Sequence, residues 1–254
     1  MPSDLNDKVV LITGASTGIG AAAARAFAAC GSRVVVHYNA SRDAAASVAE
    51  DVRKAGATAL LVGGDVTAPG VVANVVAEPM KAFGRIDVLI NNAGGMLGRV
   101  PIEQYTEEHI GRVVALNVTQ VAMFMHEVIP IMRRQKHGNV INVTSIAARN
   151  GGGGGAVLYA GAKGFVSTVT RGWAKEVVND NIRVNAVSPG VITTPFHERY
   201  SSADQMKAMQ ATVPMNRLGS ADECAGTFVY LASDEMSGYV TGQVIEVNGG
   251  QYMP

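Results

Sequence analysis

Short apolar segments recur along the chain and alternate with longer segments of helical pattern. Each apolar segment is continuous and rich in Val, Ile or Leu, which is typical of strands buried on both faces of a parallel sheet. Strands are expected at Val9–Ile12, Val34–Val36, Ala59–Val62, Val88–Ile90, Val140–Val143, Ile182–Val187 and Val244–Ile245. Helices are expected at Ile19–Ala29, Arg42–Ala55, Val71–Phe83, Glu107–Arg134, Tyr159–Val178 and Ala221–Ala232.

This alternation predicts an open α/β fold, a doubly wound seven-stranded parallel sheet with helices on both faces. A closed barrel is disfavoured because it needs eight strand–helix units. No linker or charge block divides the chain, so residues 1–254 are expected to form a single domain. Residues 193–214 depart from the alternation and contain Met206 and Met209. We interpret this segment as a substrate lid, with a surface helix packed on the core as the alternative.

Composition narrows the class of protein. Apolar residues make up 48% and charged residues 17% of the chain, which indicates a packed core rather than disorder. The 21 basic and 21 acidic residues cancel, so no net charge attracts nucleic acid or an anionic membrane. Cys30 and Cys224 form no CxxC pair and the histidines show no zinc-ligand spacing, so no metal is expected. The sequence suggests no signal segment or membrane span, and we expect a cytoplasmic protein.

A glycine-rich turn follows the first expected strand. The segment Gly14-Ala15-Ser16-Thr17-Gly18-Ile19-Gly20 joins that strand to an Ala-rich helix. Without a Cβ, glycine lets backbone N–H groups and the helix N-terminus approach a phosphate group closely. The spacing is G-x-x-x-G-x-G rather than G-x-G-x-x-G, and a tight connection without a ligand is the alternative. The strand and helix around the turn favour a pyrophosphate site.

A second group of residues suits acid–base chemistry. Tyr159 and Lys163 lie four residues apart on an expected helix, so their side chains share one face. The ammonium group is expected to lower the tyrosine pKa from its usual value near 10. Ser145 follows an expected strand at the end where open α/β sheets bind ligands, and its hydroxyl can stabilise an oxyanion. No G-x-S-x-G sequence surrounds it, so a serine hydrolase is discarded. The five glycines at 151–155 are either a pocket wall or a spacer.

Together these motifs resemble the short-chain dehydrogenase/reductase family, from about Lys8 to the C-terminus. The resemblance rests on Thr13-Gly14-x-x-x-Gly18-Ile19-Gly20, Asp65-Val66, Asn91-Asn92-Ala93-Gly94, Asn117, Ser145, Tyr159-x-x-x-Lys163, Pro189-Gly190 and Asn248-Gly249-Gly250. It implies a single-domain Rossmann fold and reversible hydride transfer between a nicotinamide cofactor and a ketone or secondary alcohol. The implied catalytic residues are Asn117, which binds a water, Ser145, Tyr159, which exchanges the proton, and Lys163. A catalytically silent redox sensor that binds NADP(H) is the alternative.

The resemblance also implies the residues that bind the cofactor. They are Gly14, Ser16, Thr17, Gly18, Ile19, Gly20, Tyr38, Asn39, Ser41, Arg42, Asp65, Val66, Asn91, Ala93, Gly94, Tyr159, Lys163, Pro189, Gly190, Ile192 and Thr194. For Asn91, a purely structural role is nearly as credible. Where NAD-dependent members carry an acid, this chain has Tyr38, and Asn39, Ser41 and Arg42 can donate hydrogen bonds to a 2′-phosphate. We expect a preference for NADP(H), with NAD(H) as the alternative.

Two features of the sequence bear on the substrate. The ending Val247–Gly250 resembles the 3-oxoacyl-[acyl-carrier-protein] reductases, whose acidic carrier protein needs basic residues at the site entrance. Arg133, Arg134 and Lys136 are candidates for that role. Residues Asn179–Asn181 depart from the Arg expected in that subgroup, so small ketones, sugars and polyols are equally credible substrates.

The resemblance further implies a homotetramer. Its interfaces would come partly from the expected helices at 107–134 and 159–178 and from the C-terminal strand region. The apolar stretch Val118–Ile131 is compatible with either an interface or the core.

Overall fold

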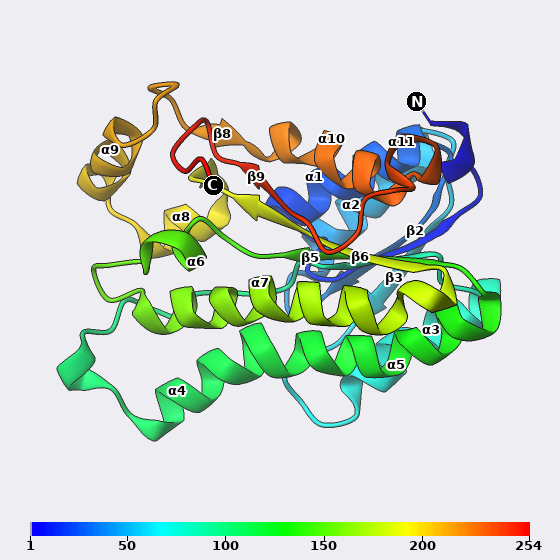
Figure 1. Ribbon diagram of the computed structural model, residues 1–254, viewed down its shortest axis with the longest axis horizontal. Coiled ribbons are helices and arrows are strands. Elements are labelled where there is room, and N and C mark those ends of the chain that lie inside the picture. The colour runs from blue at the N-terminus through cyan, green and yellow to red at the C-terminus, as the bar shows by residue number, and fades with distance from the viewer. Residues whose placement is uncertain (1) are drawn as a thin grey trace.

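A computed structural model describes residues 2–254 and confirms the expected sheet. The seven parallel strands are β1 (Val9–Ile12), β2 (Arg33–Tyr38), β3 (Ala59–Gly63), β4 (Val88–Asn91), β5 (Gly138–Val143), β6 (Ile182–Pro189) and β9 (Val244–Val247). They lie in the order β3-β2-β1-β4-β5-β6-β9 (Figure 1). The strand order reverses between β1 and β4, and the carboxyl ends of these two strands form the crevice in which such sheets bind ligands.

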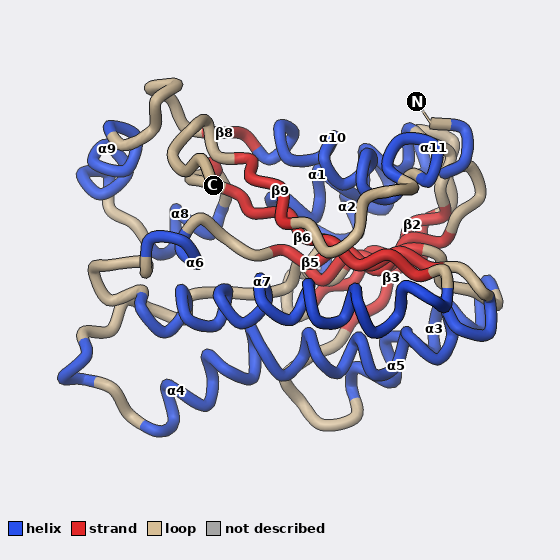
Figure 2. Tube along the Cα trace, in the orientation of Figure 1, coloured by secondary structure: helices blue, strands red, loops and turns tan. Residues whose placement is uncertain are grey.

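Helices cover both faces of the sheet, and Figure 2 shows the strands between two helical layers. One layer contains α1 (Gly18–Ala29), α2 (Arg42–Lys54) and α10 (Ala221–Ala232), and the other contains α3 (Val71–Phe83), α5 (Gln120–Gln135) and α7 (Val157–Val177). Along β1, Val10 and Ile12 pack in the first layer, whereas Val9 and Leu11 pack in the second. Because both faces are buried, the strand is apolar at every position.

The helix expected at 107–134 is continuous, but it is not α-helical throughout. It consists of α4 (Glu107–Val114), a π-helical turn at Ala115–Thr119, and α5. Residues 107–135 form the one helical segment within residues 2–254 that is long and apolar enough to cross a membrane. Phe124, Val128 and Met132 nevertheless pack in the sheet core. The segment therefore covers the sheet, and most apolar residues of 118–131 belong to the core.

The segment after β6 forms the short elements β7 (Ile192–Thr193), α8 (Pro195–Tyr200), α9 (Ala203–Ala211) and β8 (Gly219–Ser220). Strands β7 and β8 pair as a separate two-stranded sheet, and strands of only two residues leave no pattern in the sequence from which they could be predicted. Helices α8 and α9 contain no buried residue. Together with α6 (Ala147–Asn150) they lie at the left of Figure 1, where β6 and β9 end.

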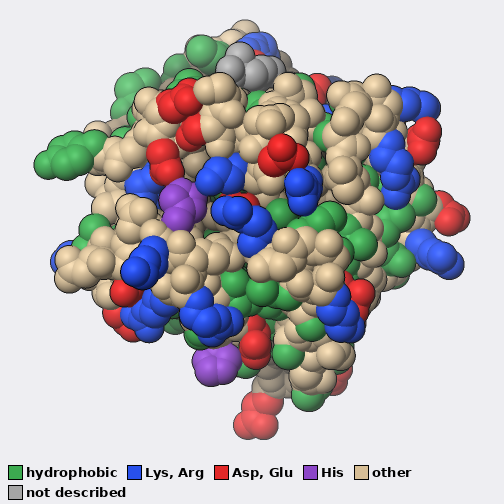
Figure 3. All heavy atoms as spheres, turned by 90° about the vertical axis from the view of Figure 1, so that its right-hand side faces the viewer, with side chains coloured by type: hydrophobic (Ala, Val, Ile, Leu, Met, Phe, Trp, Pro, Cys, Tyr) green, Lys and Arg blue, Asp and Glu red, His purple; other side chains and the backbone are tan. Residues whose placement is uncertain are grey.

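The remaining short elements are α11 (Asp234–Ser237) and the 3₁₀ turns Ser3–Leu5, Ile102–Gln104 and Val178–Asp180. Loops at the amino ends of the strands contribute to the face seen in Figure 3, where Lys and Arg side chains are interspersed with Asp and Glu.

Three basic residues lie at this amino-terminal end. Arg133 and Arg134 lie in the last turn of α5, and Lys136 follows that helix, two residues before β5 begins. The Arg133 Nε donates to Asp180 Oδ2 at 2.7 Å. The expectation that these residues line the site entrance is wrong, because α5 runs away from the carboxyl ends of the strands toward the start of β5.

Candidate active site

A cavity of about 910 Å³ lies at the carboxyl ends of the strands. It extends from the glycine-rich turn to α8 and α9. Most of the residues expected to form the site line it: Gly14, Ser16, Thr17, Gly18, Ile19, Asn39, Ser41, Asp65, Val66, Ala93, Gly94, Ser145, Tyr159, Lys163, Pro189, Gly190, Ile192 and Thr194. Five do not line it: Gly20, Tyr38, Arg42, Asn91 and Asn117.

The glycine-rich turn depends on close backbone contacts. Gly14 and Gly18 have φ angles of +63° and +56°, in the left-handed region that glycine adopts without strain. Gly20 does not line the cavity, but a Cβ there would lie 2.5 Å from the Gly14 carbonyl oxygen. The Asn92 amide donates to the carbonyls of Thr13 and Gly14 at 2.8 and 3.0 Å. Asn92 and Gly20 therefore set the shape of the turn from behind.

The start of α1 is free to receive an anion. Thr17 is the N-cap residue, yet its side chain makes no capping hydrogen bond. The first N–H groups of a helix have no partner within the helix, and the helix dipole favours negative charge beside them. The arrangement is suited to a phosphate group, as the sequence predicts.

His37 lines the cavity, and sequence reasoning missed it as a site residue. Its Nδ1 accepts a hydrogen bond from the Gly14 N–H at 3.2 Å, and its Nε2 lies 3.0 Å from the Gly64 carbonyl oxygen. Burial lowers the His37 pKa, so the ring is neutral, with its proton on Nε2. The signal was a polar residue within the apolar run of β2. His37 ties the glycine turn to the neighbouring strand ends.

The four residues proposed to select the cofactor fall into two groups. Asn39 and Ser41 line the cavity, whereas Tyr38 and Arg42 do not. The Tyr38 ring lies over Gly63, where an added Cβ would be 2.9 Å from the Tyr38 hydroxyl oxygen. Arg42 is the first residue of α2. The structure thus provides neutral hydrogen-bonding groups here rather than the Arg42 guanidinium.

Asp65 lines the same part of the cavity. Its Oδ1 accepts hydrogen bonds from the Thr67 hydroxyl at 2.7 Å and the Thr67 N–H at 2.9 Å. These bonds hold the Asp65 pKa below its usual value. The carboxylate is therefore charged and fixed in orientation at neutral pH.

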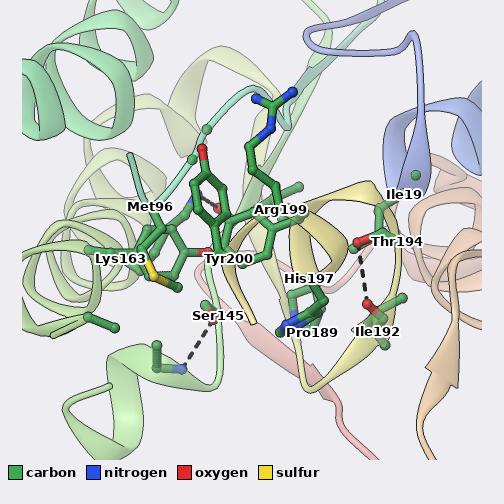
Figure 4. A pocket seen from close by; sticks show the side chains of 18 of the residues that line it. Ile19, Met96, Ser145, Lys163, Pro189, Ile192, Thr194, His197, Arg199 and Tyr200 are labelled. Carbon is green, nitrogen blue, oxygen red and sulfur yellow. Dashed lines mark hydrogen bonds between the residues drawn. The ribbon is translucent and has the colours of Figure 1, made fainter. Parts of the chain in front are cut away.

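The residues expected to carry the chemistry meet at the other end of the cavity. Figure 4 shows Ser145 and Lys163 on one side, with Thr194 and Ile192 on the other. The Lys163 Nζ donates to the Val143 carbonyl at 2.8 Å and lies 5.8 Å from the centroid of the Tyr159 ring. The Ser145 Oγ accepts a hydrogen bond from the Ala147 N–H at 3.1 Å, so the hydroxyl proton remains available.

Burial dominates the ionisation of this group. It raises the pKa of Tyr159 to about 12, against the opposing effect of a hydrogen bond with Ser145. It lowers the pKa of Lys163 to about 8. The expectation of a lowered Tyr159 pKa is wrong, because the desolvation of the phenolate dominates. At neutral pH the phenol is protonated and the ammonium is charged.

Asn117 lies in the π-helical turn, behind the cavity wall. Its Oδ1 accepts from the Gly95 N–H at 3.1 Å, and its Nδ2 donates to the carbonyls of Gly95 and Val113 at 2.9 and 3.0 Å. A Cβ at Gly94 would lie 2.9 Å from Asn117 Oδ1 and 3.1 Å from Lys163 Nζ. The amide is therefore beside Lys163, and the backbone takes both of its N–H donors and one of its two Oδ1 lone pairs. Such π turns often occur at functional sites.

Asn91 belongs to a buried hydrogen-bonded chain. Its Nδ2 donates to Asn142 Oδ1 at 2.9 Å, and Asn142 in turn donates to Thr170 Oγ1 at 2.9 Å. Asn91 does not line the cavity. These contacts favour the structural alternative for this residue, since they join β4, β5 and α7 below the site.

The segment expected to be a lid contacts the catalytic end directly. The Phe196 ring lies 5.6 Å from the Tyr159 ring and 5.1 Å from the Tyr200 ring, measured between centroids. The Arg99 Nε donates to the Tyr200 carbonyl at 2.8 Å, and its Nη1 donates to the Gly154 carbonyl at 3.2 Å. Arg99 therefore joins α8 to the five-glycine loop, which forms part of the cavity wall.

Known proteins are similar to this chain over nearly their full length. Residues 14–251 match the family model described as Enoyl-(Acyl carrier protein) reductase. A 3-oxoacyl-[acyl-carrier-protein] reductase from Synechocystis sp. is 38% identical over 253 residues, which cover 98% of each chain.

Solved structures agree with this match. The NADH-dependent reductase A1-R', described as responsible for alginate metabolism, is 36% identical with a TM-score of 0.92, and the match covers 99% of this chain and 100% of that one. The same reductase in complex with NAD gives a TM-score of 0.90 at 36% identity, covering 100% of both chains. A short-chain type dehydrogenase/reductase from Mycobacterium marinum is 34% identical with a TM-score of 0.92, covering 99% and 98% of the two chains.

Proposed function

The chain belongs to the short-chain dehydrogenase/reductase family of oxidoreductases, and we propose that it interconverts a small ketone and a secondary alcohol with NADP(H) as preferred cofactor. The observation that carries the proposal is the presence of Ser145, Tyr159 and Lys163 in the same cavity as the glycine turn. One end of the cavity is suited to phosphate and the other to proton transfer. A nicotinamide dinucleotide joins two such ends.

The residues present fit that cofactor. The uncapped start of α1 would hold the pyrophosphate, with Gly14 and Gly18 allowing close approach. Asn39, Ser41 and Asp65 would hold the adenosine, and Lys163 and Thr194 line the end proposed for the nicotinamide and its ribose. When bound, the nicotinamide supplies or accepts the hydride.

The remaining chemistry falls to three side chains. During reduction the Ser145 hydroxyl donates a hydrogen bond to the carbonyl oxygen of the substrate, and Tyr159 gives that oxygen its proton. The raised pKa keeps Tyr159 protonated and ready to donate at neutral pH. The positive charge of Lys163 stabilises the phenolate that remains. During oxidation the proton returns to Tyr159.

Tyr159→Phe tests this function. We expect turnover of a carbonyl panel with NADPH to be lost, because the substitution removes the hydroxyl that gives the substrate oxygen its proton. NADPH affinity, measured by fluorescence titration, should change by less than about twofold, since only a hydroxyl is removed. Turnover that survives the substitution contradicts the assigned role. A wild-type protein that binds NADPH but reduces nothing in the panel favours the redox-sensor alternative.

The NADP(H) preference rests on the chemistry around Asn39 and Ser41. Within residues 2–254, Asp65 is the one acidic residue that lines the cavity, and Thr67 already occupies one of its oxygens. No carboxylate is therefore placed beside Asn39 to repel a 2′-phosphate. Against this, a solved relative is described as NADH-dependent.

Asn39→Asp tests the preference. The new carboxylate should lower the ratio of kcat/KM for NADPH to that for NADH by about tenfold or more, through repulsion of the 2′-phosphate. Asn39→Ala is the matched control, because it removes the amide without adding charge. A wild-type ratio below one, or equal effects of the two substitutions, would contradict the proposed basis of selection.

A small carbonyl compound is proposed over a carrier-bound thioester. The relative from Synechocystis sp. acts, by its name, on 3-oxoacyl groups carried by a protein. In this chain the basic residues Arg133, Arg134 and Lys136 lie at the amino ends of the strands, at the opposite end of the sheet from the cavity. Acetoacetyl thioester should therefore be reduced more slowly than small ketones or ketoses in the same NADPH assay.

Assembly and location are also proposals. Met123 on α5 and Phe165 on α7 are large apolar side chains that are more than a third exposed, which favours the tetramer implied by the family resemblance. Light scattering that gives a monomer would contradict it. Cys30 and Cys224 are buried and unpaired, which is compatible with the reducing cytoplasm.

A further inference from the structure

The part of the cavity next to the proposed hydride-transfer end carries an excess of positive charge. Arg99 and Arg199 line it, together with His197. Within residues 2–254, the one acidic lining residue is Asp65, which belongs to the adenosine end. A neutral ketone or ketose offers no anionic group to pair with these two guanidinium groups, which have no carboxylate partner among the described lining residues.

Arg99 is half-buried and its charge is not neutralised. Its partners within hydrogen-bond distance are the carbonyls of Tyr200, Gly153 and Gly154 and the hydroxyl of Ser201, all of them uncharged. It takes part in no ion pair in the described part of the chain. A partly desolvated cation with neutral partners retains a field that favours an anion in the cavity.

Arg199 lies on the part of the cavity wall formed by α8, and its side chain is exposed. It lies on α8 three residues after Phe196, whose ring packs against Tyr159, so the two side chains share a face of the helix about 5–6 Å apart. Arg199 makes no hydrogen bond or ion pair with any residue from 2 to 254. Its five N–H donors face solvent and can also bind a ligand in the cavity.

We propose that the substrate is a carbonyl compound bearing an anionic oxygen group, a carboxylate or a phosphate, which pairs with Arg199 at the α8 wall of the cavity. Arg99 acts as a positioning residue: it fixes α8 through the Tyr200 carbonyl and adds its charge to the field. The inference rests on the proposed oxidoreductase function. It narrows the substrate from any small carbonyl compound to a charged one.

Three six-carbon ketoses provide a direct test, because they share a skeleton and differ in charge. We compare D-fructuronate, which carries a carboxylate at C6, D-fructose 6-phosphate, which carries a phosphate at C6, and D-fructose, which is neutral. The wild-type kcat/KM for one of the two anions should exceed that for D-fructose by about 10- to 100-fold, as expected for a charge-assisted hydrogen bond. The anion with the higher kcat/KM shows whether the site prefers a carboxylate or a phosphate. Equal, Tyr159-dependent turnover of all three overturns the inference and leaves the proposed function intact.

Variants separate contact from position. Arg199→Gln should raise KM for the preferred anion by about tenfold or more and leave D-fructose unchanged, whereas Arg199→Lys should recover part of the loss. Arg99→Gln should raise KM for all three ketoses, because it releases α8. Glu198→Gln, on the adjacent residue outside the cavity lining, is the matched control and should change nothing. An Arg199→Gln effect equal for charged and neutral ketoses would show a merely structural role.

Binding provides a readout that does not need turnover. D-gluconate and D-glucitol, which lack a carbonyl, are titrated into the NADPH-bound protein while its fluorescence is followed, with glycerol 1-phosphate and glycerol as the phosphate pair. One of the two anions should bind at least tenfold more tightly than its neutral partner, and Arg199→Gln should remove the difference. If the anion binds more tightly but the protein reduces none of the ketoses, the result supports an anionic ligand and contradicts the proposed catalytic function. Equal binding within both pairs overturns the inference.

Discussion

Gly20→Ala is expected to damage both the fold and the cofactor site, although Gly20 does not line the cavity. A Cβ at this position would lie 2.5 Å from the Gly14 carbonyl oxygen, 2.6 Å from Asn92 Nδ2 and 3.0 Å from Ala15 Cα. Carbon–oxygen contacts without strain begin near 3.3 Å, so the turn must move by about 0.8 Å. Two of the three neighbouring atoms belong to the backbone, so a change of rotamer cannot relieve the contact.

The expected magnitude follows from two opposing terms. Overpacking of this kind costs about 1–3 kcal/mol, and the rigid backbone neighbours place it at the upper end. The better helix propensity of Ala returns up to about 1 kcal/mol. A net loss of about 1–2 kcal/mol corresponds to a fall in Tm of roughly 2–8 °C for a chain of this length. Displacement of the turn by nearly 1 Å should lower kcat/KM for NADPH by about 10- to 100-fold.

Gly226→Ala is the matched control. Gly226 lies within α10, is exposed, and has nothing within 4 Å of an added Cβ. The same substitution should here stabilise the protein by about 0.5–1 kcal/mol and leave the kinetics unchanged. Thermal unfolding and NADPH saturation curves of both variants give the comparison. If Gly20→Ala raises Tm as Gly226→Ala does and keeps the NADPH KM, the reasoning from close approach is refuted.

Two further predictions concern ionisation. The rate of ketone reduction should fall as pH rises through about 8, because Lys163 then loses the proton that stabilises the phenolate. Lys163→Arg, which stays charged, should lack this inflection in a pH profile of kcat, and an unchanged inflection would assign it to another group. Hydrogen bonds from His137 and Arg183 hold the Asp234 pKa at about 2, so its contribution to stability is complete above pH 3.8 and lost as pH falls through 2. Asp234→Asn should therefore cost about 1–2 kcal/mol in urea unfolding at pH 7, given its half-exposed position, and a difference that persists at pH 2 would argue against this origin.

The sequence by itself determined the sheet and the order of its elements. In a chain of this composition, continuous Val- and Ile-rich runs form strands that are covered on both faces. The helices that alternate with these strands determine the crossover connections between them. The four-residue spacing of Tyr159 and Lys163 is enough to place both side chains on one helical face. The glycine turn was readable for the same reason, since only local geometry is involved.

Tertiary structure decided what depends on distant neighbours. Tyr38 and Arg42 lie next to Asn39 and Ser41 in the sequence, but the packing of β3 and α2 removes them from the cavity lining. The burial that raises the Tyr159 pKa comes from surrounding elements, among them α8, which lies far along the chain and packs Phe196 on the Tyr159 ring. Arg99 and Arg199 are a hundred residues apart in sequence, so their shared surplus of charge exists only once the chain has folded. Local pattern sets which elements form, whereas solvent exclusion and charge depend on what those elements place side by side.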